Sequence, residues 1–267
     1  MDITLIIVSF KSENLIHKNI KNLDSNLKII IIENSNDSKM KENIEKKYEN
    51  VKVILNQNKG FGQAANLGAK LANTKYLLFC SPDNFLEKNF IQKLDQIINN
   101  SKDKLDMLVL TNFDQIINTK KKIETPKGIS CFLLEKKIFF NQFGFDENFF
   151  LYYEDIDFLK RFLTNKLHVY QIPVYYTNHS GSHDKEFNKP VEINRNWHYM
   201  WSKFYFNKKH NGYIYAFCVT IPFFIRSIIK AIIYVNNENK RKIYLSRASG
   251  LFNSYMLKKS WYRPQIK

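Results

Sequence analysis

The chain has 267 residues, a net charge of +16 and a hydrophobic content of 44%. This composition excludes general disorder, and the length allows one large α/β domain or one domain with an appendage. The charge is uneven, because residues 185–267 hold sixteen Lys and Arg against three Glu, a net of +13. Such a basic region predicts a polyanion or an anionic membrane surface as a partner.

Strands and helices alternate through the first part of the chain. Continuous apolar runs predict strands buried on both faces at Asp2–Phe10, Lys28–Ile32, Val51–Leu55 and Tyr76–Cys80. Helices are expected between them, at Ser12–Asn22 with Ser12 as its cap, in a Lys/Glu-rich segment after Ser38, and in a small-residue segment that ends near Ala72. This alternation predicts parallel strands joined by right-handed crossovers.

The pattern is less regular after the fourth strand. Strands are expected at Leu105–Thr111, Gly128–Leu134 and His168–Thr177, the last interrupted at Pro173. Helices are expected at Phe85–Asn99, Glu135–Phe143 and Asn194–Lys209, with a polar hairpin or loop at Gln115–Glu124. An acidic and aromatic loop followed by a helix fills Phe145–Asn165. We therefore expect an α/β domain over residues 1–210 and a helical, basic region over 211–267.

The apolar segment Tyr213–Val235 allows three interpretations. Its uninterrupted run of thirteen residues ends at Ile225, short of the about 20 that a membrane span needs, and Arg226 and Lys230 follow. The alternatives are a core or dimer helix and a helix lying in a membrane interface. The basic surroundings favour the interfacial helix. A final amphipathic helix is expected at Tyr244–Lys259, and the sequence is compatible with a homo-oligomer.

Cysteine usage and the N-terminus bear on the compartment. The cysteines have no CxxC or metal-ligand spacing, which indicates buried thiols in a reducing compartment: Cys80, Cys131 and Cys218. Asp2 is acidic, and the apolar stretch that follows it is short with no small-residue cleavage site, so no signal peptide is expected. We expect a cytoplasmic protein, peripheral on the inner face of the cell membrane.

Asp83 follows the fourth strand, which ends at Pro82 because proline has no N–H to donate to a strand neighbour. Ligands of open α/β sheets bind beyond the carboxyl ends of the strands. A carboxylate there can hold a hard divalent cation, and the cation in turn holds a diphosphate. The alternative is a turn aspartate that caps the next helix.

Five motifs in order resemble one known family, the inverting family 2 glycosyltransferases with a GT-A fold. They are LIIVSFKSENLIHKNIKNL, IIIIENSNDS, NQNKGFGQAANLGAKLA, YLLFCSPD and FGFDENFFLYYEDIDFLKR. The resemblance covers roughly residues 2–210 and is greatest for the rhamnosyltransferase-like branch, which builds bacterial surface polysaccharides such as lipopolysaccharide. It implies a Rossmann-like, mostly parallel sheet flanked by helices. It also implies transfer from a nucleotide-diphosphate sugar to a glycan or lipid-linked acceptor, with Mg²⁺ or Mn²⁺.

The last motif contains the carboxylates that the resemblance implies for sugar transfer. Transfer to a hydroxyl needs a base for the acceptor proton, and the resemblance assigns this role to Asp155, with Glu154 helping to bind the acceptor or orient the base. The alternative is an acidic cap at a helix N-terminus, in which Asp157 pairs with Arg161 one turn on.

The resemblance also implies a donor site. Its nucleotide-binding positions are Ser9, Phe10, Glu33, Asn34, Lys59, Asn66 and Asp83. Asp83 and His179 are the expected metal ligands, with His183 as a competitor for the histidine position. The sequence departs from the family twice, because Glu33 stands where the family has Asp, and Ser81 stands where an Asp or Asn begins the carboxylate pair.

Two other classes explain less of the sequence. A non-enzymatic polyanion- or membrane-binding protein would use the basic C-terminal region, with Trp197–Lys209 stacking bases. No nucleic-acid motif is present, however, and the acidic segment Phe145–Asp157 would have no role, so no nucleic acid is expected. A nucleotidyltransferase would need a glycine-rich loop after the first strand, and the segment SFKSEN has no glycine.

Overall fold

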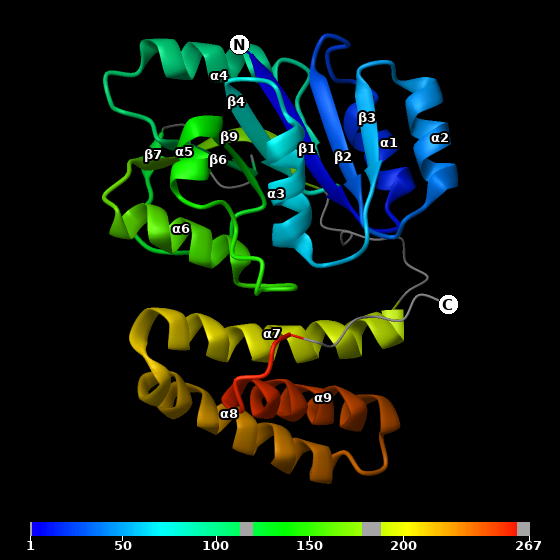
Figure 1. The fold of residues 1–267 in the computed structure, drawn as a ribbon, viewed down its shortest axis with the longest axis vertical. Coiled ribbons are helices and arrows are strands. Elements are labelled where there is room, and N and C mark those ends of the chain that lie inside the picture. Colours follow the sequence, from blue (N-terminus) through cyan, green and yellow to red (C-terminus); the bar gives the residue numbers. More distant parts are fainter. Residues whose placement is uncertain (1, 113–119, 178–187, 261–267) are drawn as a thin grey trace. The chain divides into compact units, whose positions relative to one another are not determined.

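The computed structural model describes residues 2–112, 120–177 and 188–260. The chain divides into two compact units (Figure 1). The α/β unit comprises Met1–Asp146 and Asp155–Asp184, and the helical unit comprises Glu147–Glu154 and Lys185–Lys267. The sequence predicted a boundary at residue 210. The structure instead groups the helix before that point, and the short segment Glu147–Glu154, with the C-terminal helices.

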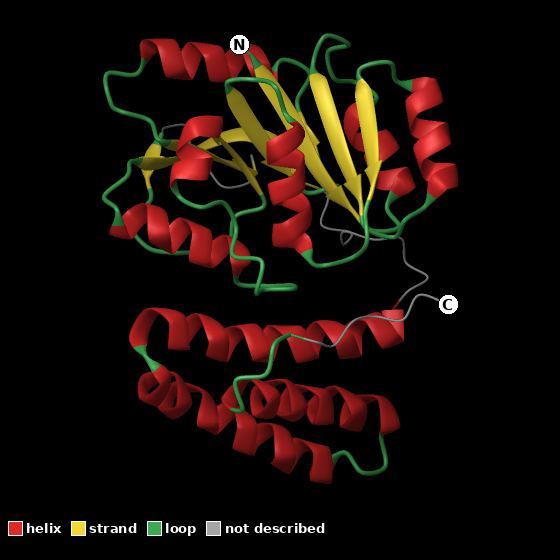
Figure 2. Ribbon diagram, in the orientation of Figure 1, coloured by secondary structure: helices red, strands yellow, loops and turns green. Residues whose placement is uncertain are grey.

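In the described residues of the α/β unit, nine strands form one sheet, and Figure 2 shows this sheet among the helices. Eight of them follow the order β3-β2-β1-β4-β8-β6-β9-β5, and β7 pairs with β9. The strands are β1 (Ile3–Ser9), β2 (Lys28–Glu33), β3 (Val51–Leu55), β4 (Tyr76–Cys80), β5 (Asn84–Leu86), β6 (Met107–Asn112), β7 (Lys121–Lys122), β8 (Cys131–Glu135) and β9 (Val169–Thr177).

The first four strands are parallel, as their alternation with helices predicted. β8 departs from that pattern, because it lies between β4 and β6 and runs antiparallel to both. Its first residue, Cys131, therefore pairs with the last residue of β4, Cys80. This reversal brings the chain just before β8 to the carboxyl end of β4.

Helices cover both faces of the sheet. They are α1 (Glu13–Ile20), α2 (Ser38–Lys47), α3 (Phe61–Leu71), α4 (Phe90–Asn100), α5 (Lys136–Asn141) and α6 (Glu154–Thr164). Alternate residues of each strand enter different cores: Ile31 contacts the core that α1, α2 and α4 share, and Ile32 contacts the core of α3, α5 and α6. The central strands are thus apolar throughout because both of their faces are buried.

Two elements differ from expectation after β4. Residues Asn84–Leu86 form β5, an edge strand paired with β9, where the sequence predicted the start of a helix. The helix α4 consequently begins only at Phe90. Pro173 lies within β9, next to a register shift in its pairing with β6, so the proline interrupts the ladder without ending the strand.

The helical unit contains α7 (Asn188–Asn211), α8 (Tyr213–Ile233) and α9 (Glu238–Tyr255), which pack against one another. Gly250 of α9 has no room for a side chain, since a Cβ there would lie 2.3 Å from the Trp197 carbonyl oxygen of α7. By length and composition α8 could cross a membrane, with a mean hydropathy of 1.9 and only 22% of its most apolar window buried. Those two properties alone do not distinguish a span from other apolar helices.

Candidate functional site

The carboxyl ends of three neighbouring parallel strands meet at one edge of the sheet. Ser9 at the end of β1 is in register with Glu33 at the end of β2, and Ile7 is in register with Cys80 at the end of β4. The backbone N–H of Asn34 donates to the Ser9 carbonyl oxygen at 2.8 Å. The expected donor-binding residues of β1 and β2 therefore lie side by side, at the edge where open α/β sheets bind ligands.

The turn after β1 is held by its own hydrogen bonds. The Ser9 side chain is buried, and its hydroxyl faces Sδ of Met40 at 4.0 Å. Ser12 stands at the N-cap of α1 as expected, but its hydroxyl donates to the Phe10 carbonyl oxygen at 3.0 Å instead of capping the helix. Ser9 and Phe10 thus shape the rim of the edge with their backbone.

Glu33 has a buried carboxylate at this edge, and one of its oxygens is available to a ligand. Its side chain is fully buried, and its Oε1 accepts hydrogen bonds from the backbone N–H of Ser35 at 2.7 Å and from the Ser35 hydroxyl. Its Oε2 is also buried and has no hydrogen-bond partner among the described residues. A buried carboxylate oxygen without a donor is costly, so this atom is suited to accept a hydrogen bond from a ligand.

Asn34 supports the glycine turn that precedes α3. Its side-chain amide donates to the Gly60 carbonyl oxygen at 3.5 Å and accepts from the Asn56 amide at 2.8 Å. Gly60 has φ = 108° at the N-cap of α3, a conformation that favours glycine. Lys59 beside it is exposed and has no ion pair among the described residues, so its ammonium can turn towards an anion.

Asn66 is bound to another part of the α/β unit. Its amide donates to the Phe145 carbonyl oxygen and accepts from the Phe145 N–H, both at 2.9 Å. Its side chain is buried. The Asn66 amide therefore fixes the chain where the motif FGFDENFF begins, a structural task that the sequence did not reveal.

Asp83 lies in a turn that is anchored from two directions. Asn84 donates through its side chain to the carbonyl oxygen and the hydroxyl of Ser130, both at 3.1 Å. Asn19 of α1 donates to the carbonyl oxygens of Ser81 and Pro82, both at 3.5 Å. The half-buried Asp83 carboxylate itself has no hydrogen bond or ion pair within the described ranges. It is thus an oriented and unneutralised charge at the end of β4.

Asp155 is tied to the same strand end. Its Oδ2 accepts from the backbone N–H of Ile129, and its Oδ1 accepts from the N–H of Ile156, each at 2.8 Å. Ile129 precedes Ser130, which bonds to the Asp83 turn, so a short stretch of backbone connects the two carboxylates. Burial raises the pKa of the Asp155 carboxyl above its ordinary value, and the backbone donors oppose that rise. A raised pKa makes the carboxylate a stronger base.

Asp157, in contrast, has a structural role. Its side chain is fully buried and its Oδ2 accepts from Nε of Arg161 at 3.0 Å, the helical ion pair that the spacing predicted. Arg161 also donates to the carbonyl oxygens of Gln142 and Gly144. The pair thus closes the turn before Phe145, and only Asp155 of these two aspartates is accessible to a substrate.

The segment Glu147–Glu154 belongs to the helical unit, although Asp155 follows it directly. It packs on α7, where the ring of Phe150 lies 4.4 Å from that of His198 and the Ser202 hydroxyl donates to the Leu151 carbonyl oxygen at 3.0 Å. Tyr152 and Tyr153 have φ of 69° and 70°. Two successive non-glycine residues in this strained conformation are unusual, and such strain gathers at functional sites. No local sequence pattern predicted this conformation.

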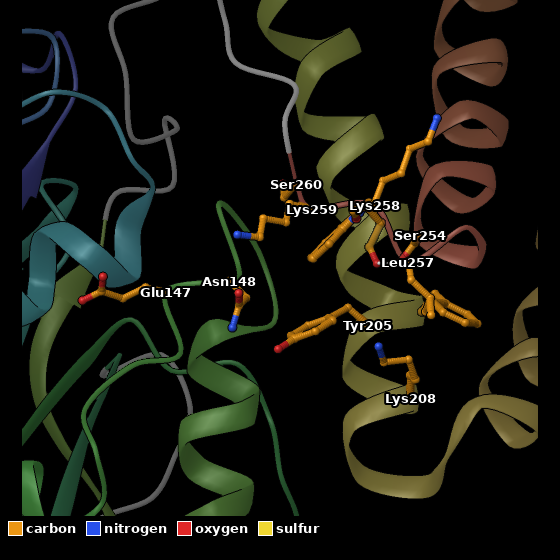
Figure 3. A pocket seen from close by; sticks show the side chains of 11 residues that line it. Glu147, Asn148, Tyr205, Lys208, Ser254, Leu257, Lys258, Lys259 and Ser260 are labelled. Atoms are coloured by element: carbon orange, nitrogen blue, oxygen red, sulfur yellow. Dashed lines mark hydrogen bonds between the residues drawn. The ribbon is translucent and has the colours of Figure 1, made fainter.

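A pocket of about 220 Å³ opens in the helical unit beside this segment (Figure 3). It lies between Glu147–Asn148, α7 and the residues that follow α9. Trp201 and Tyr205 stack in its wall with ring centroids 5.0 Å apart. Three lysines also line it: Lys208, Lys258 and Lys259. A sugar ring can pack against an aromatic face, and its hydroxyl groups can accept hydrogen bonds from lysine side chains.

His179 and His183 lie outside the described residues, so the histidine part of the expected metal site is untested. Among the residues that the structure describes, no group of three His, Cys, Asp or Glu could hold a metal ion. A site built from protein side chains alone is therefore not seen in this part of the chain. A single carboxylate such as Asp83 fits Mg²⁺ or Mn²⁺ when diphosphate and water oxygens supply the other ligands.

The fold and the edge geometry agree with a match to a family model. Residues 4–167 match the model described as Glycosyl transferase family 2. The chain belongs to this glycosyltransferase family. The match includes the positions of Glu33, Gly60, Asp83 and Asp155. No curated protein matched the chain.

Solved structures place this family 2 member in the GT-A fold. It resembles Staphylococcus aureus TarS 1-349, with TM-score 0.56, 12% identity, and coverage of 98% of this chain and 93% of TarS 1-349. It also resembles the mannosyltransferase PcManGT from Pyrobaculum calidifontis in complex with GDP-Man and Mn²⁺, with TM-score 0.58, 10% identity, and coverage of 97% and 88%. The rhamnosyltransferase-like branch is not distinguished by these matches.

Proposed function

We propose that this protein is an inverting glycosyltransferase that moves a sugar from a nucleotide-diphosphate donor to a hydroxyl of a glycan or lipid-linked acceptor. The observation that carries the proposal is the Asp155 carboxylate, half-buried and oriented by two backbone N–H groups at the strand end that also holds Asp83. Family membership supports sugar transfer as the reaction class.

The chemistry requires one proton to move. The acceptor hydroxyl attacks the anomeric carbon of the donor sugar while the bond from that carbon to the diphosphate oxygen breaks. Asp155 accepts the hydroxyl proton, and its raised pKa suits it to this step. A single displacement on the face opposite the leaving group inverts the anomeric configuration. Glu154, the preceding residue, is proposed to bind the acceptor.

The donor is proposed to lie along the strand ends. The unpartnered Oε2 of Glu33 suits a ribose hydroxyl or a base N–H, and Lys59 suits a phosphate. Ser9, Phe10 and Asn34 shape this part of the site through the turns they hold. Asp83, with His179 as a further candidate, would hold Mg²⁺ or Mn²⁺, which would neutralise the diphosphate as it leaves. Two solved neighbours, PcManGT and GalNAc-T7, are complexed with Mn²⁺.

The proposed setting is the synthesis of a bacterial surface polysaccharide, with a donor of the rhamnosyl type. An acceptor carried on a lipid would bring the enzyme to the cytoplasmic face of the membrane, and the basic helical unit suits a peripheral association there. The solved neighbours bind UDP-GlcNAc and GDP-Man, which indicates the donor class without fixing the nucleotide or the sugar.

A donor screen tests the proposal. UDP-, dTDP- and GDP-sugars are each incubated with Mg²⁺ or Mn²⁺ and a lipid-linked acceptor, and nucleotide release is measured. We expect release with one donor class, dependent on the acceptor, and NMR of the product should show an inverted anomeric linkage. Retention of configuration would reject Asp155 as the base of a single displacement. No release with any donor, from protein that binds nucleotide, would reject the acceptor class.

A further inference from the structure

The helix α8 is amphipathic in the reverse sense to a helix of a soluble protein. The residues it buries are small or polar: Ala216, Thr220, Ser227 and Ala231. Its outward face carries large apolar side chains, among them Ile214, Ile225, Ile229 and Ile232, which are 79%, 52%, 50% and 69% exposed. Helices of soluble proteins turn such residues inward. A contiguous apolar face of this kind marks an interaction surface.

The interior of the helical unit shows the matching feature. Hydroxyl groups there bond to backbone carbonyl oxygens of a neighbouring helix, as Ser246 does with Ile193 at 2.7 Å and Ser254 with Trp201 at 3.0 Å. Gly250 allows α9 to approach the backbone of α7 closely. Small residues and hydroxyl bonds at helix contacts are typical of helices that pack in an apolar surrounding. Phe223 and Phe224 of α8 pack against the core of the helical unit, whereas the exposed isoleucines of the same helix do not belong to that core.

A basic pocket opens beside the apolar face. It has a volume of about 200 Å³, and α7, α8 and α9 all contribute to its wall. Its lining residues include three cations and no carboxylate: Tyr199, Met200, Lys203, Phe223, Arg226, Ser227, Tyr244 and Arg247. Arg226 directly follows the outward-facing Ile225, so the pocket borders the apolar face of α8.

The cations in this pocket have no acidic partner among the residues that the structure describes. Lys203 Nζ lies 3.5 Å from the centroid of the Phe223 ring, and burial lowers the pKa of this lysine. Arg247 donates from Nε to Oδ1 of Asn196 at 2.7 Å, a neutral acceptor. Arg226 has no hydrogen bond or ion pair to any described residue. Three positive groups around one cavity without an anion favour binding of a negatively charged ligand.

We propose that this pocket binds the phosphate of an anionic phospholipid, while the outward face of α8 inserts among the acyl chains beside it. The inference rests on the proposed membrane association and names the site that would carry it. A second copy of the chain would also cover apolar surface, but it would bring the same excess of positive charge, +13 over residues 185–267. An anionic lipid surface would bury the apolar face of α8 and pair with the cations of the pocket at the same time.

Vesicle co-sedimentation of the full-length protein tests the proposal. Vesicles of pure phosphatidylcholine are compared with equimolar phosphatidylglycerol and phosphatidylcholine, at low and high salt. The pocket variant Lys203→Gln/Arg226→Gln/Arg247→Gln should bind the anionic vesicles about 100-fold more weakly, at about fivefold per charge. The single variant Arg226→Gln, at an exposed position, should lose about fivefold. Ile225→Ser/Ile229→Ser should also weaken binding, because it removes apolar surface.

A matched control removes the same charge from the α/β unit. Lys18, Lys39 and Lys46 are exposed and form no ion pair with any described residue, so their triple replacement by Gln should change vesicle affinity by less than about threefold. Equal losses in the two triple variants would mean that net charge alone drives binding and would overturn the pocket. No binding to either vesicle would reject the membrane association itself, whereas donor release would remain a separate test of the enzyme.

Two further outcomes would overturn the assignment. If inorganic phosphate alone raises the unfolding temperature through the pocket residues, while anionic vesicles do not bind, the ligand is a free phosphate. If light scattering shows a dimer that Ile225→Ser/Ile229→Ser converts to a monomer, and vesicle binding is absent, a second copy covers α8. Retained nucleotide affinity in each variant shows that the α/β unit is folded.

Discussion

The backbone N–H of Ile129 donates a hydrogen bond to Oδ2 of Asp155 over 2.8 Å, which ties the entry of β8 to the first turn of α6. The donor belongs to the backbone, so no side-chain change removes it. Gly128 stands next to it, and a Cβ at that position would lie 3.3 Å from the same oxygen. The antiparallel direction of β8 creates this contact, because it starts the strand where β4 ends.

Asp155→Asn is expected to lower kcat by about 10²- to 10⁴-fold, the usual contribution of a general base. The amide is nearly the same size as the carboxylate, so donor affinity, measured by calorimetry, should change by less than about threefold. Asp157→Asn is the matched control. It breaks a buried ion pair and should destabilise the fold by about 1–3 kcal/mol while the remaining folded enzyme keeps its turnover. Near-normal kcat for Asp155→Asn would reject this base.

The pH dependence of kcat follows from the burial of Asp155. The base must be ionised, so turnover falls as the pH drops through its folded-state pKa, which burial raises above the ordinary 3.8. The raised pKa means that the folded state binds this proton more tightly than the unfolded state does. The contribution of Asp155 to stability is therefore present at low pH and is lost as the pH rises through the folded-state pKa. Asp155→Asn has no titratable group at this position, so it should remove this part of the pH dependence of the unfolding temperature. An acid limb of kcat at or below the ordinary pKa would contradict the raised value.

Glu33→Gln tests the unpartnered oxygen at the end of β2. Glutamine keeps one oxygen for the two donors of Ser35, but it replaces the free acceptor with an NH₂ group. Nucleotide affinity should fall by roughly tenfold or more, the range for a lost hydrogen bond to a charged group. Glu42→Gln, at an exposed position of α2, removes the same charge and should leave the affinity unchanged. Equal affinities of wild type and Glu33→Gln would exclude Glu33 from the donor site.

Asp83→Ala tests the metal at the end of β4. Calorimetric titration of a nucleoside diphosphate with and without Mn²⁺ should show that the metal strengthens binding to wild type and has little effect in the variant. Affinities in the presence of EDTA should match, because the nucleotide contacts of the other residues are unchanged. An unaltered metal dependence in Asp83→Ala would show that other residues hold the ion.

The central part of the α/β unit could be predicted because its signals are local. Continuous apolar runs predicted β1 to β4, since a strand buried on both faces needs apolar residues at every position. The spacing of Asp157 and Arg161 predicted their ion pair because residues four apart meet on a helix. The resemblance named Asp155, and the structure adds its two backbone donors.

The remaining features depend on contacts between distant residues. A strand that is buried on both faces is apolar at every position whether it runs parallel or antiparallel to its neighbours. The sequence therefore could not show that β8 is antiparallel. Asn66 binds the backbone of Phe145, 79 residues away, and no local pattern distinguishes that role from a contact with nucleotide. Tyr152 and Tyr153, whose φ is positive, likewise contact the distant Tyr199 of α7. The helix α9 was predicted to begin at Tyr244 because its first turns are polar. It begins at Glu238, and Asn237 caps it.

Gly250→Ala sets two effects of opposite sign against each other. In an exposed helix interior, replacing glycine by alanine stabilises by about 1 kcal/mol through helix propensity. At this position the new Cβ would lie 2.3 Å from the Trp197 carbonyl oxygen and 3.2 Å from its carbonyl carbon, and both neighbours are backbone atoms. The helices α7 and α9 must therefore separate, and overpacking of this kind costs typically 1–3 kcal/mol, occasionally more.

The steric cost should exceed the gain in propensity because both neighbours are backbone atoms, so Gly250→Ala is expected to lower the free energy of unfolding of the helical unit by up to about 2 kcal/mol. Urea denaturation followed by tryptophan fluorescence measures it, because Trp197 and Trp201 both lie in α7 of this unit. Asn239→Ala, at an exposed position in the first turn of α9, should stay within about 0.5 kcal/mol. A more stable Gly250→Ala variant would show that α7 and α9 do not approach as closely as their backbones indicate.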